Sequence, residues 1–298
     1  MTPTTNRPYA GEDDYARMRA LLTASSALDG SAVYCTVGDL DWWRYNDEPE
    51  AIALAHLWFT GDLLVGVAWP KNDQVDLLTH PHHRDIEAGM VSWAERARRV
   101  RAGAGGGALP LRAWAYDGDA PRTALLQAHG YVRTATHFRY HSRPLDTPVP
   151  ASPLLPGYAL RSVMGTADIE PRVAVHRAVF APSRISAARY HRLIGAPTYR
   201  ADLDLIVVAP DGTFAAFCIV WFDVANRLGV FEPVGTHPAH RRRGLGRAVL
   251  YEGLRRLRRL GARTAYVNSY GGDEAAERLY SSVGFQLVDC NHAWEKLL

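Results

Sequence analysis

The stretch Val234-Gly-Thr-His-Pro-Ala-His-Arg-Arg-Arg-Gly-Leu-Gly-Arg247 decides the fold of this 298-residue chain. It opens with apolar residues typical of a strand and turns at Pro238. Two glycines, Gly244 and Gly246, then begin an amphipathic run that continues to about Leu260. The pattern predicts a strand, a glycine loop and a helix whose first backbone amides are unpaired. Such a helix N-terminus binds phosphate oxygens, and glycine lets them approach the backbone closely.

The spacing of the glycines distinguishes between phosphate-binding motifs. A Walker loop needs a lysine directly after its last glycine, and none follows Gly246; a dinucleotide fingerprint needs a third glycine where this chain has Val249. The pattern that fits is Arg-x-x-Gly-x-Gly, formed by Arg241, Gly244 and Gly246. Here the chain resembles the GNAT acetyltransferase superfamily, whose pyrophosphate loop carries Gln/Arg-x-x-Gly-x-Gly/Ala between the fourth strand and the third helix. The alternative is a basic loop on an ordinary surface helix.

The resemblance implies that acetyl-coenzyme A binds along this stretch as a co-substrate. Pro233 cannot donate to a sheet ladder, so it suits the splayed strand that GNAT domains have here. In the family, the splay lets pantetheine amides pair with the strand, and one strand amide, for which we choose Val234, polarises the acetyl carbonyl. The expected cofactor contacts are Val234, Gly235, Thr236, Arg241, Arg242, Arg243, Gly244, Leu245, Gly246 and Arg247.

Composition and charge are those of an ordinary globular protein. Apolar residues make up 47% of the chain and charged residues 22%, and no apolar run is long enough for a membrane span. The three cysteines are odd in number and far apart, which indicates a cytoplasmic protein with free thiols. The net charge is +3, and arginines cluster between Arg241 and Arg259. This positive surface suits an anionic cofactor better than nucleic acid.

An internal repeat organises the chain. A shift of about 157 residues aligns Thr79-His-Pro-His-His-Arg84 with Thr236-His-Pro-Ala-His-Arg241. We therefore expect two tandem domains: a first copy at residues 1–145, a proline-rich linker at 146–156 and a second copy at 157–298. Each copy is expected to be an α/β (α+β) domain with a mixed, mostly antiparallel sheet flanked by helices. Its final elements are expected to form a hairpin from residues 285–287 and 293–297.

The first copy departs from the cofactor motif. Glu87 stands at the position of Gly244, which places a carboxylate where a pyrophosphate would lie. GNAT enzymes also carry Leu-Tyr before a closing Gly-Phe, and the first copy has Leu125-Leu126 instead. We therefore expect the first copy to be degenerate and the second to be catalytic.

The second copy retains the tyrosine of that marker. Leu279-Tyr280 precedes Gly284-Phe285, and the resemblance implies that Tyr280 protonates the departing thiolate. The alternative is an aromatic side chain on the buried face of a helix. The family often has an asparagine seven residues before this tyrosine, where this chain has Asp273. Asn268 is a possible substitute for that cofactor contact.

The strand before the loop supplies the other candidates. Glu232 is the only carboxylate in it and is expected either to take a proton from the attacking amine or to pair with a nearby arginine. Trp221 and Asp223, at the end of the preceding strand, are candidate substrate contacts. His80 and His83 correspond to His237 and His240 of the second copy. Because no acidic or cysteine partners cluster with His80, His82 and His83, we expect local hydrogen bonding and no metal.

These features predict an N-acetyltransferase. Acetyl-coenzyme A binds the second copy, and a primary amine of a small molecule attacks the thioester directly in a ternary complex. No cysteine or serine motif indicates a covalent acyl-enzyme. The alternatives are a non-catalytic acyl-coenzyme A sensor and a nucleic-acid binder that uses the arginine-rich helix.

Overall fold

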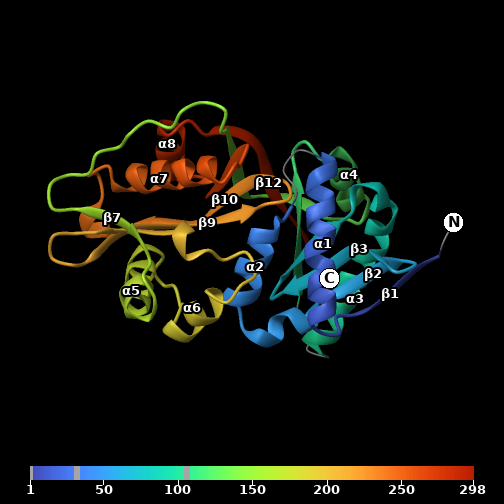
Figure 1. Ribbon diagram of the computed structural model, residues 1–298. Coiled ribbons are helices and arrows are strands. Elements are labelled where there is room, and N and C mark those ends of the chain that lie inside the picture. The colour runs from blue at the N-terminus through green and yellow to red at the C-terminus, as the bar shows by residue number, and fades with distance from the viewer. Residues whose placement is uncertain (1–2, 30–33, 104–107) are drawn as a thin grey trace. The chain divides into compact units, whose positions relative to one another are not determined.

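The computed structural model describes residues 3–29, 34–103 and 108–298 (Figure 1). They form two compact units. Unit 1 comprises Met1–Thr36, Pro49–Tyr140 and Val288–Leu298, and unit 2 comprises Val37–Glu48 and His141–Leu287. Residues 37–48 of unit 2 thus lie between two parts of unit 1 in the sequence, and residues 288–298 of unit 1 follow the end of unit 2.

Unit 1 is built on a sheet with helices packed against it. The strand order is β1-β2-β3-β4-β5-β12-β6, and the single β4–β5 pairing, at Gln74 and Arg112, is parallel. Helices α1 and α3 both pack on β3. The elements are β1 (Thr4–Pro8), α1 (Glu12–Asp29), β2 (His56–Thr60), β3 (Leu63–Lys71), β4 (Gln74–Thr79), α3 (Glu87–Ala102), β5 (Pro110–Tyr116), α4 (Ala120–Ala128) and β6 (Val132–Pro144).

Unit 2 has the strand order β11-β10-β9-β8-β7, with β6 next to β11. Helices α7 and α8 lie on one side of these strands, and α5 and α6 lie on the other (Figure 1). The elements are α2 (Val37–Asn46), β7 (Ala159–Ser162), α5 (Ile169–Val179), α6 (Ala187–Leu193), β8 (Asp204–Val208), β9 (Phe214–Asp223), β10 (Leu228–Thr236), α7 (Leu245–Arg259), β11 (Thr264–Tyr270) and α8 (Glu274–Ser282).

Helix α7 follows the predicted apolar pattern. Its apolar side is buried at Val249, Leu254 and Leu257, which pack against strands β8 to β11, while its arginines remain on the outer side. On the other face of the sheet, Trp42 of α2 and Tyr190 of α6 pack around Trp221 of β9. The sheet is therefore covered on both faces, which fixes the position of β10.

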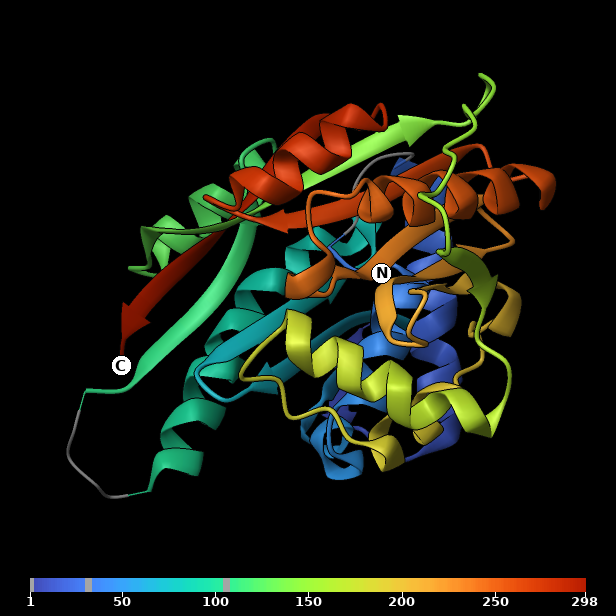
Figure 2. The ribbon, with the colours of Figure 1, turned by 90° about the vertical axis from the view of Figure 1, so that its left-hand side faces the viewer.

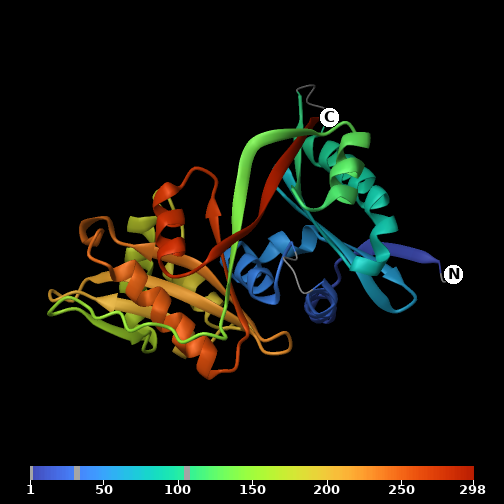
Figure 3. The ribbon, with the colours of Figure 1, turned by 90° about the horizontal axis from the view of Figure 1, so that it is seen from above.

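The last strand differs from the expected hairpin. Residues Gln286–Leu297 form one continuous strand, β12, which runs to the C-terminus (Figure 2). Asn291 to Leu297 pair antiparallel with Tyr116 to Pro110 of β5. Within unit 1, β12 lies between β5 and β6 (Figure 3). The hairpin prediction is wrong because these backbone groups find partners on β5 of the first copy instead of turning back on themselves.

The predicted type of sheet is confirmed. The sheet is mixed and mostly antiparallel, and helices flank it. In the part of the chain that the structure describes, none of the helices combines the length and apolar character that crossing a membrane demands.

Candidate active site

Strand β10 opens on one side halfway along its length. It pairs antiparallel with β9, and the register shifts between Phe231 and Val234, which marks a bulge. Its parallel pairing with β11 covers only Leu228 to Phe231. From Glu232 onward, the β11 side of the strand therefore has no registered partner.

Strand alternation shows which backbone groups face this opening. His237 donates its amide hydrogen to Ala215 of β9 at 2.9 Å, so its backbone groups point toward β9. In an antiparallel ladder this direction alternates with each residue. Gly235, opposite Phe217, therefore points toward β9, and Val234, opposite Cys218, points away from it. The N–H and C=O groups of Val234 are thus directed into the opening.

The glycine loop adds a second set of free donors. Gly244 adopts a left-handed conformation with φ of 74°, and open space surrounds the position of a β-carbon there. The first helical bond of α7 runs from Ala248 N to Gly244 O at 3.0 Å. The amides of Leu245, Gly246 and Arg247 precede this bond, so no helical carbonyl accepts from them. Free amides at a helix N-terminus favour an anion beside them.

The positive charge of the loop also favours an anion. Arg241, Arg242, Arg243 and Arg247 are all exposed, and residues 237–247 contain no carboxylate. The guanidinium group of Arg243 donates to the Tyr158 hydroxyl at 2.5 Å, and that hydroxyl lies 3.0 Å from His240 Nδ1. Free amides and unneutralised arginines together fit a pyrophosphate-bearing group such as coenzyme A.

Tyr280 lies in helix α8 and is only 6% exposed. Burial raises the pKa of its phenol above the ordinary value, and the negative charges of Asp273 and Glu232 raise it further. The structure therefore places the predicted acid within electrostatic range of the predicted base. The same burial keeps the Tyr280 hydroxyl protonated at neutral pH.

The side chain of Trp221 contacts the backbone of Glu232. The Trp221 indole donates to the Glu232 carbonyl at 2.6 Å, while the indole ring itself is buried in the core. Trp221 thus supports the bulge of β10 from the neighbouring strand. The Glu232 side chain remains partly accessible at the point where β10 leaves β11.

The other predicted residues have diverse surroundings. Asn268 lies on β11, and its buried side-chain oxygen has no hydrogen-bond partner within the described ranges. Asp273 caps α8 by accepting from Ala276 N at 3.0 Å. Asp223 accepts from the backbone and side-chain nitrogens of Asn226 in the β9–β10 turn. Because Asp223 pairs with Leu228, it lies at the opposite end of β10 from the glycine loop.

His141 is a neighbour of the site that sequence reasoning missed. It lies on the terminal part of β6 within unit 2, is 4% exposed, and its ring is edge-on to Tyr280 with centroids 5.9 Å apart. Its position in the sequence, at the end of the first copy, gave no signal that it would adjoin the second. Cys218, by contrast, is buried and donates to the Val249 carbonyl, and burial raises the pKa of its thiol.

Comparison with known proteins identifies the family. The model of the acetyltransferase (GNAT) family matches residues 177–285. A mycothiol acetyltransferase of Kineococcus radiotolerans is 34% identical over 218 residues, which span 70% of this chain and 68% of the relative. A second mycothiol acetyltransferase, from Salinispora tropica, is 32% identical over 71% of this chain and 69% of its own. The chain belongs to the GNAT acetyltransferase family.

Solved structures share the tandem GNAT fold. A GCN5-related N-acetyltransferase from Sphaerobacter thermophilus superposes with a TM-score of 0.69 at 20% identity, over 99% of this chain and 95% of that one. A tandem GNAT protein from the clavulanic acid biosynthesis pathway gives 0.67 at 19% identity, over 99% and 98%.

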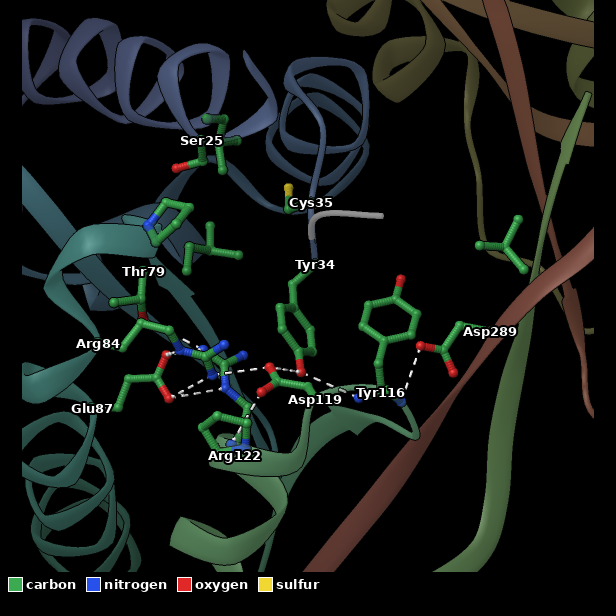
Figure 4. Close-up of a pocket in the computed structure, with 16 residues that line it drawn as sticks. Ser25, Tyr34, Cys35, Thr79, Arg84, Glu87, Tyr116, Asp119, Arg122 and Asp289 are labelled. Atoms are coloured by element: carbon green, nitrogen blue, oxygen red, sulfur yellow. Dashed lines mark hydrogen bonds and ion pairs between the residues drawn. The ribbon is translucent and has the colours of Figure 1, made fainter. Parts of the chain in front are cut away.

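In the first copy, side chains fill the space beside the residues that align with Val234, Thr236 and Gly244 (Figure 4). Arg122 of α4 donates to the Leu77 carbonyl at 3.0 Å, and Leu77 is the counterpart of Val234. The same guanidinium contacts Thr79, the counterpart of Thr236, and pairs with Glu87 at 2.7 Å. Arg84 pairs with Glu87 from the other side at 3.0 Å. An internal ion cluster thus occupies both the strand edge and the phosphate loop.

Removing the carboxylate of Glu87 tests this cluster. Arg122 is 2% exposed and Glu87 is 3% exposed, so their pair is fully buried. Burial alone would raise the pKa of Glu87, but the charges of Arg122 and Arg84 lower it below its ordinary value. We expect Glu87→Ala to lower the free energy of unfolding by about 3 kcal/mol, because a buried guanidinium loses its partner.

Urea denaturation measures this effect. The matched control is Glu274→Ala, which breaks an exposed pair with Arg278 and should change the free energy of unfolding by less than about 0.5 kcal/mol. Equal effects of the two substitutions would contradict the role assigned to the buried cluster.

His176 makes the stability of unit 2 depend on pH. It lies on α5 among Trp42, Phe180 and Phe217. Burial, followed by the charge of Arg172, lowers its pKa to about 4. Between pH 6.5 and pH 4, His176 therefore binds a proton in the unfolded chain but not in the folded chain. We expect stability to be full above pH 6.5 and to fall by up to about 3 kcal/mol as the pH drops to 4.

Denaturation at pH 7.5 and pH 4.5 checks this prediction. His176→Gln removes the titrating ring and should flatten the pH dependence, whereas His191→Gln, at an exposed position of α6, should leave it unchanged. A wild-type pH dependence that persists in His176→Gln would contradict the assignment.

The repeated histidines bond locally, as predicted. His80 Nδ1 accepts from His82 N at 3.2 Å, and His237 Nδ1 accepts from Ala239 N at the same distance. Another group in unit 1, formed by Asp117, Cys290 and His292, brings three possible metal ligands within 4.8 Å of one another. The Arg133 guanidinium lies 2.6 Å from His292 and 3.0 Å from Asp117, so a divalent ion would have to displace it.

Proposed function

We propose that this GNAT protein transfers the acetyl group of acetyl-coenzyme A to a primary amine of a small molecule. The observation that carries the proposal is the meeting of three features in unit 2. The open backbone edge at Val234 lies one short loop away from the amides and arginines of the α7 N-terminus, and Tyr280 and Glu232 are within electrostatic range of each other.

The residues divide into binding and reacting groups. The amides of residues 245–247 and the loop arginines hold the pyrophosphate. The backbone of Val234 to Thr236 pairs with the pantetheine arm, and the unpartnered side-chain oxygen of Asn268 is available to one of its amides. The same assignment gives the first copy no such role, because Arg122 and Glu87 already fill its equivalent edge and loop.

The reaction requires two proton transfers. The amine nitrogen forms a bond to the thioester carbon, and the Val234 N–H stabilises the negative charge that develops on the carbonyl oxygen. Glu232 takes the proton that the attacking nitrogen loses, directly or through water. The carbon–sulfur bond then breaks, and Tyr280 donates its proton to the departing thiolate. The products are the acetylated amine and free coenzyme A.

The raised pKa of Tyr280 is compatible with its role as an acid. Burial raises the pKa of the phenol, and it would raise the proton affinity of a thiolate in the same surroundings for the same reason. The proton affinities of the Tyr280 phenolate and the departing thiolate therefore remain close to each other. Cys218 is unsuited to form an acyl-enzyme, since burial keeps its thiol protonated and no base adjoins it within the described residues.

Glu232→Gln tests the proposed base. The substitution keeps the shape of the side chain but removes its ability to take a proton, so we expect kcat to fall about 10²-fold with the KM for acetyl-coenzyme A unchanged. Steady-state kinetics at saturating amine measure both constants. Glu274→Gln, at an exposed position in the first turn of α8, is the control. A fall in stability without a fall in kcat would make Glu232 an ion-pair partner instead.

The proposed function is tested by thiol release from acetyl-coenzyme A. Because the relatives are named mycothiol acetyltransferases, the amine panel includes a mycothiol precursor beside a polyamine, an amino acid and an aminoglycoside. We expect turnover of at least one amine, with one acetylated product per thiol released. Tight binding of acetyl-coenzyme A with no turnover of any amine would favour a sensor over an enzyme.

A further inference from the structure

Three possible metal ligands meet in unit 1 where the end of β5 lies beside β12. Asp117 directly follows β5, and its backbone amide donates to the Cys290 carbonyl at 2.9 Å. Cys290 and His292 are two residues apart on β12, so their side chains face the same side of the sheet. One carboxylate oxygen, the thiol sulfur and one imidazole nitrogen of these residues all lie within 4.8 Å of one another.

The spacing of these atoms fits a single metal ion. Zinc binds imidazole nitrogen and carboxylate oxygen at about 2.0–2.2 Å and thiolate sulfur at about 2.3 Å, in a tetrahedron. Two ligand atoms of such a tetrahedron are therefore about 3.4–3.6 Å apart. The distance between Asp117 Oδ2 and His292 Nε2 is 3.5 Å. This pair thus has the spacing of two zinc ligands, and the Cys290 sulfur is close enough to become the third.

The side chain of Arg133, on β6, shows where a cation binds. One of its guanidinium nitrogens lies 2.6 Å from His292 Nε2 and 3.0 Å from Asp117 Oδ1. Because a guanidinium group only donates, His292 Nε2 accepts, and its lone pair points toward the cation. A neutral imidazole with a lone pair directed in this way is the form that binds metals. The carboxylate and the imidazole therefore converge on one positively charged position.

A metal ion would use this position more fully than the guanidinium group does. Cys290 is a free cysteine, and sulfur is a weak hydrogen-bond acceptor but a strong zinc ligand as a thiolate. A thiolate and a carboxylate together neutralise a divalent ion. The side chains of Arg133 and Asp117 are 48% and 45% exposed, so the guanidinium group can move into water and an ion can enter from it.

The fold itself does not require these residues. When the aspartate caps of α4 and α8 are aligned, Gly271 of the second copy stands at the position of Asp117, and Leu287 stands at the position of Arg133. The second copy therefore forms the same strand-to-helix connection without either charged residue. The cluster is a feature of the first copy alone, which favours a role other than folding.

We propose that Asp117, Cys290 and His292 bind a divalent transition-metal ion of the zinc type, which displaces Arg133 into water. Binding releases the thiol proton of Cys290 to solvent, and a water molecule completes the tetrahedron. The His137 ring stacks on His292 with centroids 4.8 Å apart and orients the imidazole. The ion cross-links the end of β5 to β12. The site is separate from the proposed acetyl transfer, because all these residues belong to unit 1.

Titration of the full, untagged chain with Co²⁺, followed by absorption spectroscopy, tests the proposal. Cobalt occupies zinc sites, and a cobalt–thiolate bond gives a charge-transfer band in the near ultraviolet. We expect this band to saturate at one molar equivalent of Co²⁺. We also expect Zn²⁺ to abolish it, because thiolate ligands in a tetrahedron favour zinc. Absence of a thiolate band in the wild type would overturn the proposal.

Variants assign the band to this cluster. Cys290→Ser should remove the band, and His292→Gln should weaken Co²⁺ binding about tenfold or more, because each removes one ligand. Arg133→Gln should tighten binding about tenfold, because the ion then breaks no charge-assisted hydrogen bonds. Cys35→Ala, which removes a buried thiol of unit 1, is the control and should bind like wild type.

Two results with these variants would overturn the proposal, provided that circular dichroism shows each variant to be folded. The first is a thiolate band that persists in Cys290→Ser. The second is weaker Co²⁺ binding by Arg133→Gln than by the wild type, because the guanidinium group would then support the ion instead of competing with it.

Discussion

We expect Gly244→Glu to weaken coenzyme A binding by about 10³-fold or more, while the chain remains folded. A glutamate here copies Glu87 of the first copy, and its carboxylate would repel the pyrophosphate and pair with the loop arginines. The left-handed backbone of Gly244, with φ of 74°, adds a conformational cost of about 1 kcal/mol for any other residue. Calorimetric titration with coenzyme A measures the loss.

Gly244→Asn separates charge from backbone strain. Asparagine tolerates the left-handed conformation better than other residues and carries no charge. No atom lies within 4 Å of the β-carbon position, so the side chain has room. We expect this variant to bind coenzyme A within about tenfold of wild type. If it lost binding as completely as Gly244→Glu, the shape of the loop and not its charge would explain both results.

Tyr280→Phe lowers kcat by about 10²-fold or more and leaves the KM for acetyl-coenzyme A almost unchanged. The substitution removes the proton that the departing thiolate needs but retains the aromatic ring, which packs against Phe285 and His141. Steady-state thiol release at saturating amine measures the change.

The matched control for the acid is Tyr251→Phe. Tyr251 lies on α7, and its hydroxyl donates to the Ser282 carbonyl, so its loss removes one hydrogen bond at the surface. We expect normal kcat in this variant. Wild-type turnover in Tyr280→Phe would remove the phenol from the mechanism and leave water or the amine product as the source of the proton.

The sequence predicted the parts of the fold that depend on local patterns. The strand β10 and the amphipathic helix α7 are confirmed, because apolar runs and helical periodicity each act over a few residues. Helix α2 ends at Asn46, and a 3₁₀ turn follows from Pro49. Pro49 lacks the amide hydrogen that a continuing helix would need.

Local sequence patterns could not predict which strands pair when they are far apart in the sequence. The segment between residues 287 and 293 contains no signal that it would continue as a strand beside β5, since pairing partners are chosen by the whole sheet. For the same reason, the sequence could not predict that His141 lies beside Tyr280, because this contact depends on β6 lying next to β11. Strand β1 at Thr4–Pro8 was also missed, because it has no alternating apolar residues and forms only by adding to β2.

The candidate site likewise has features that the sequence predicts and features that only the structure shows. The spacing predicted the glycine loop, and the repeat alignment placed Glu87 at the position of Gly244. The degeneracy of the first copy stays a prediction. The role of Arg122 could not be predicted, because only the structure brings it to the Leu77 carbonyl and Glu87 together. Its counterpart in the second copy is Ala276, since Ala276 donates its amide to the α8 cap Asp273 as Arg122 does to the α4 cap Asp119. The side chain of Ala276 is too small to reach that edge. The roles of Tyr280, Glu232 and the cofactor contacts remain predictions that kinetics must test.

Coenzyme A stoichiometry, measured by calorimetric titration of the wild-type chain, tests most directly the claim that only the second copy holds the cofactor. We expect one molar equivalent to bind to the wild type and none to Gly244→Glu. Two equivalents bound by the wild type, or one equivalent retained by Gly244→Glu, would contradict it.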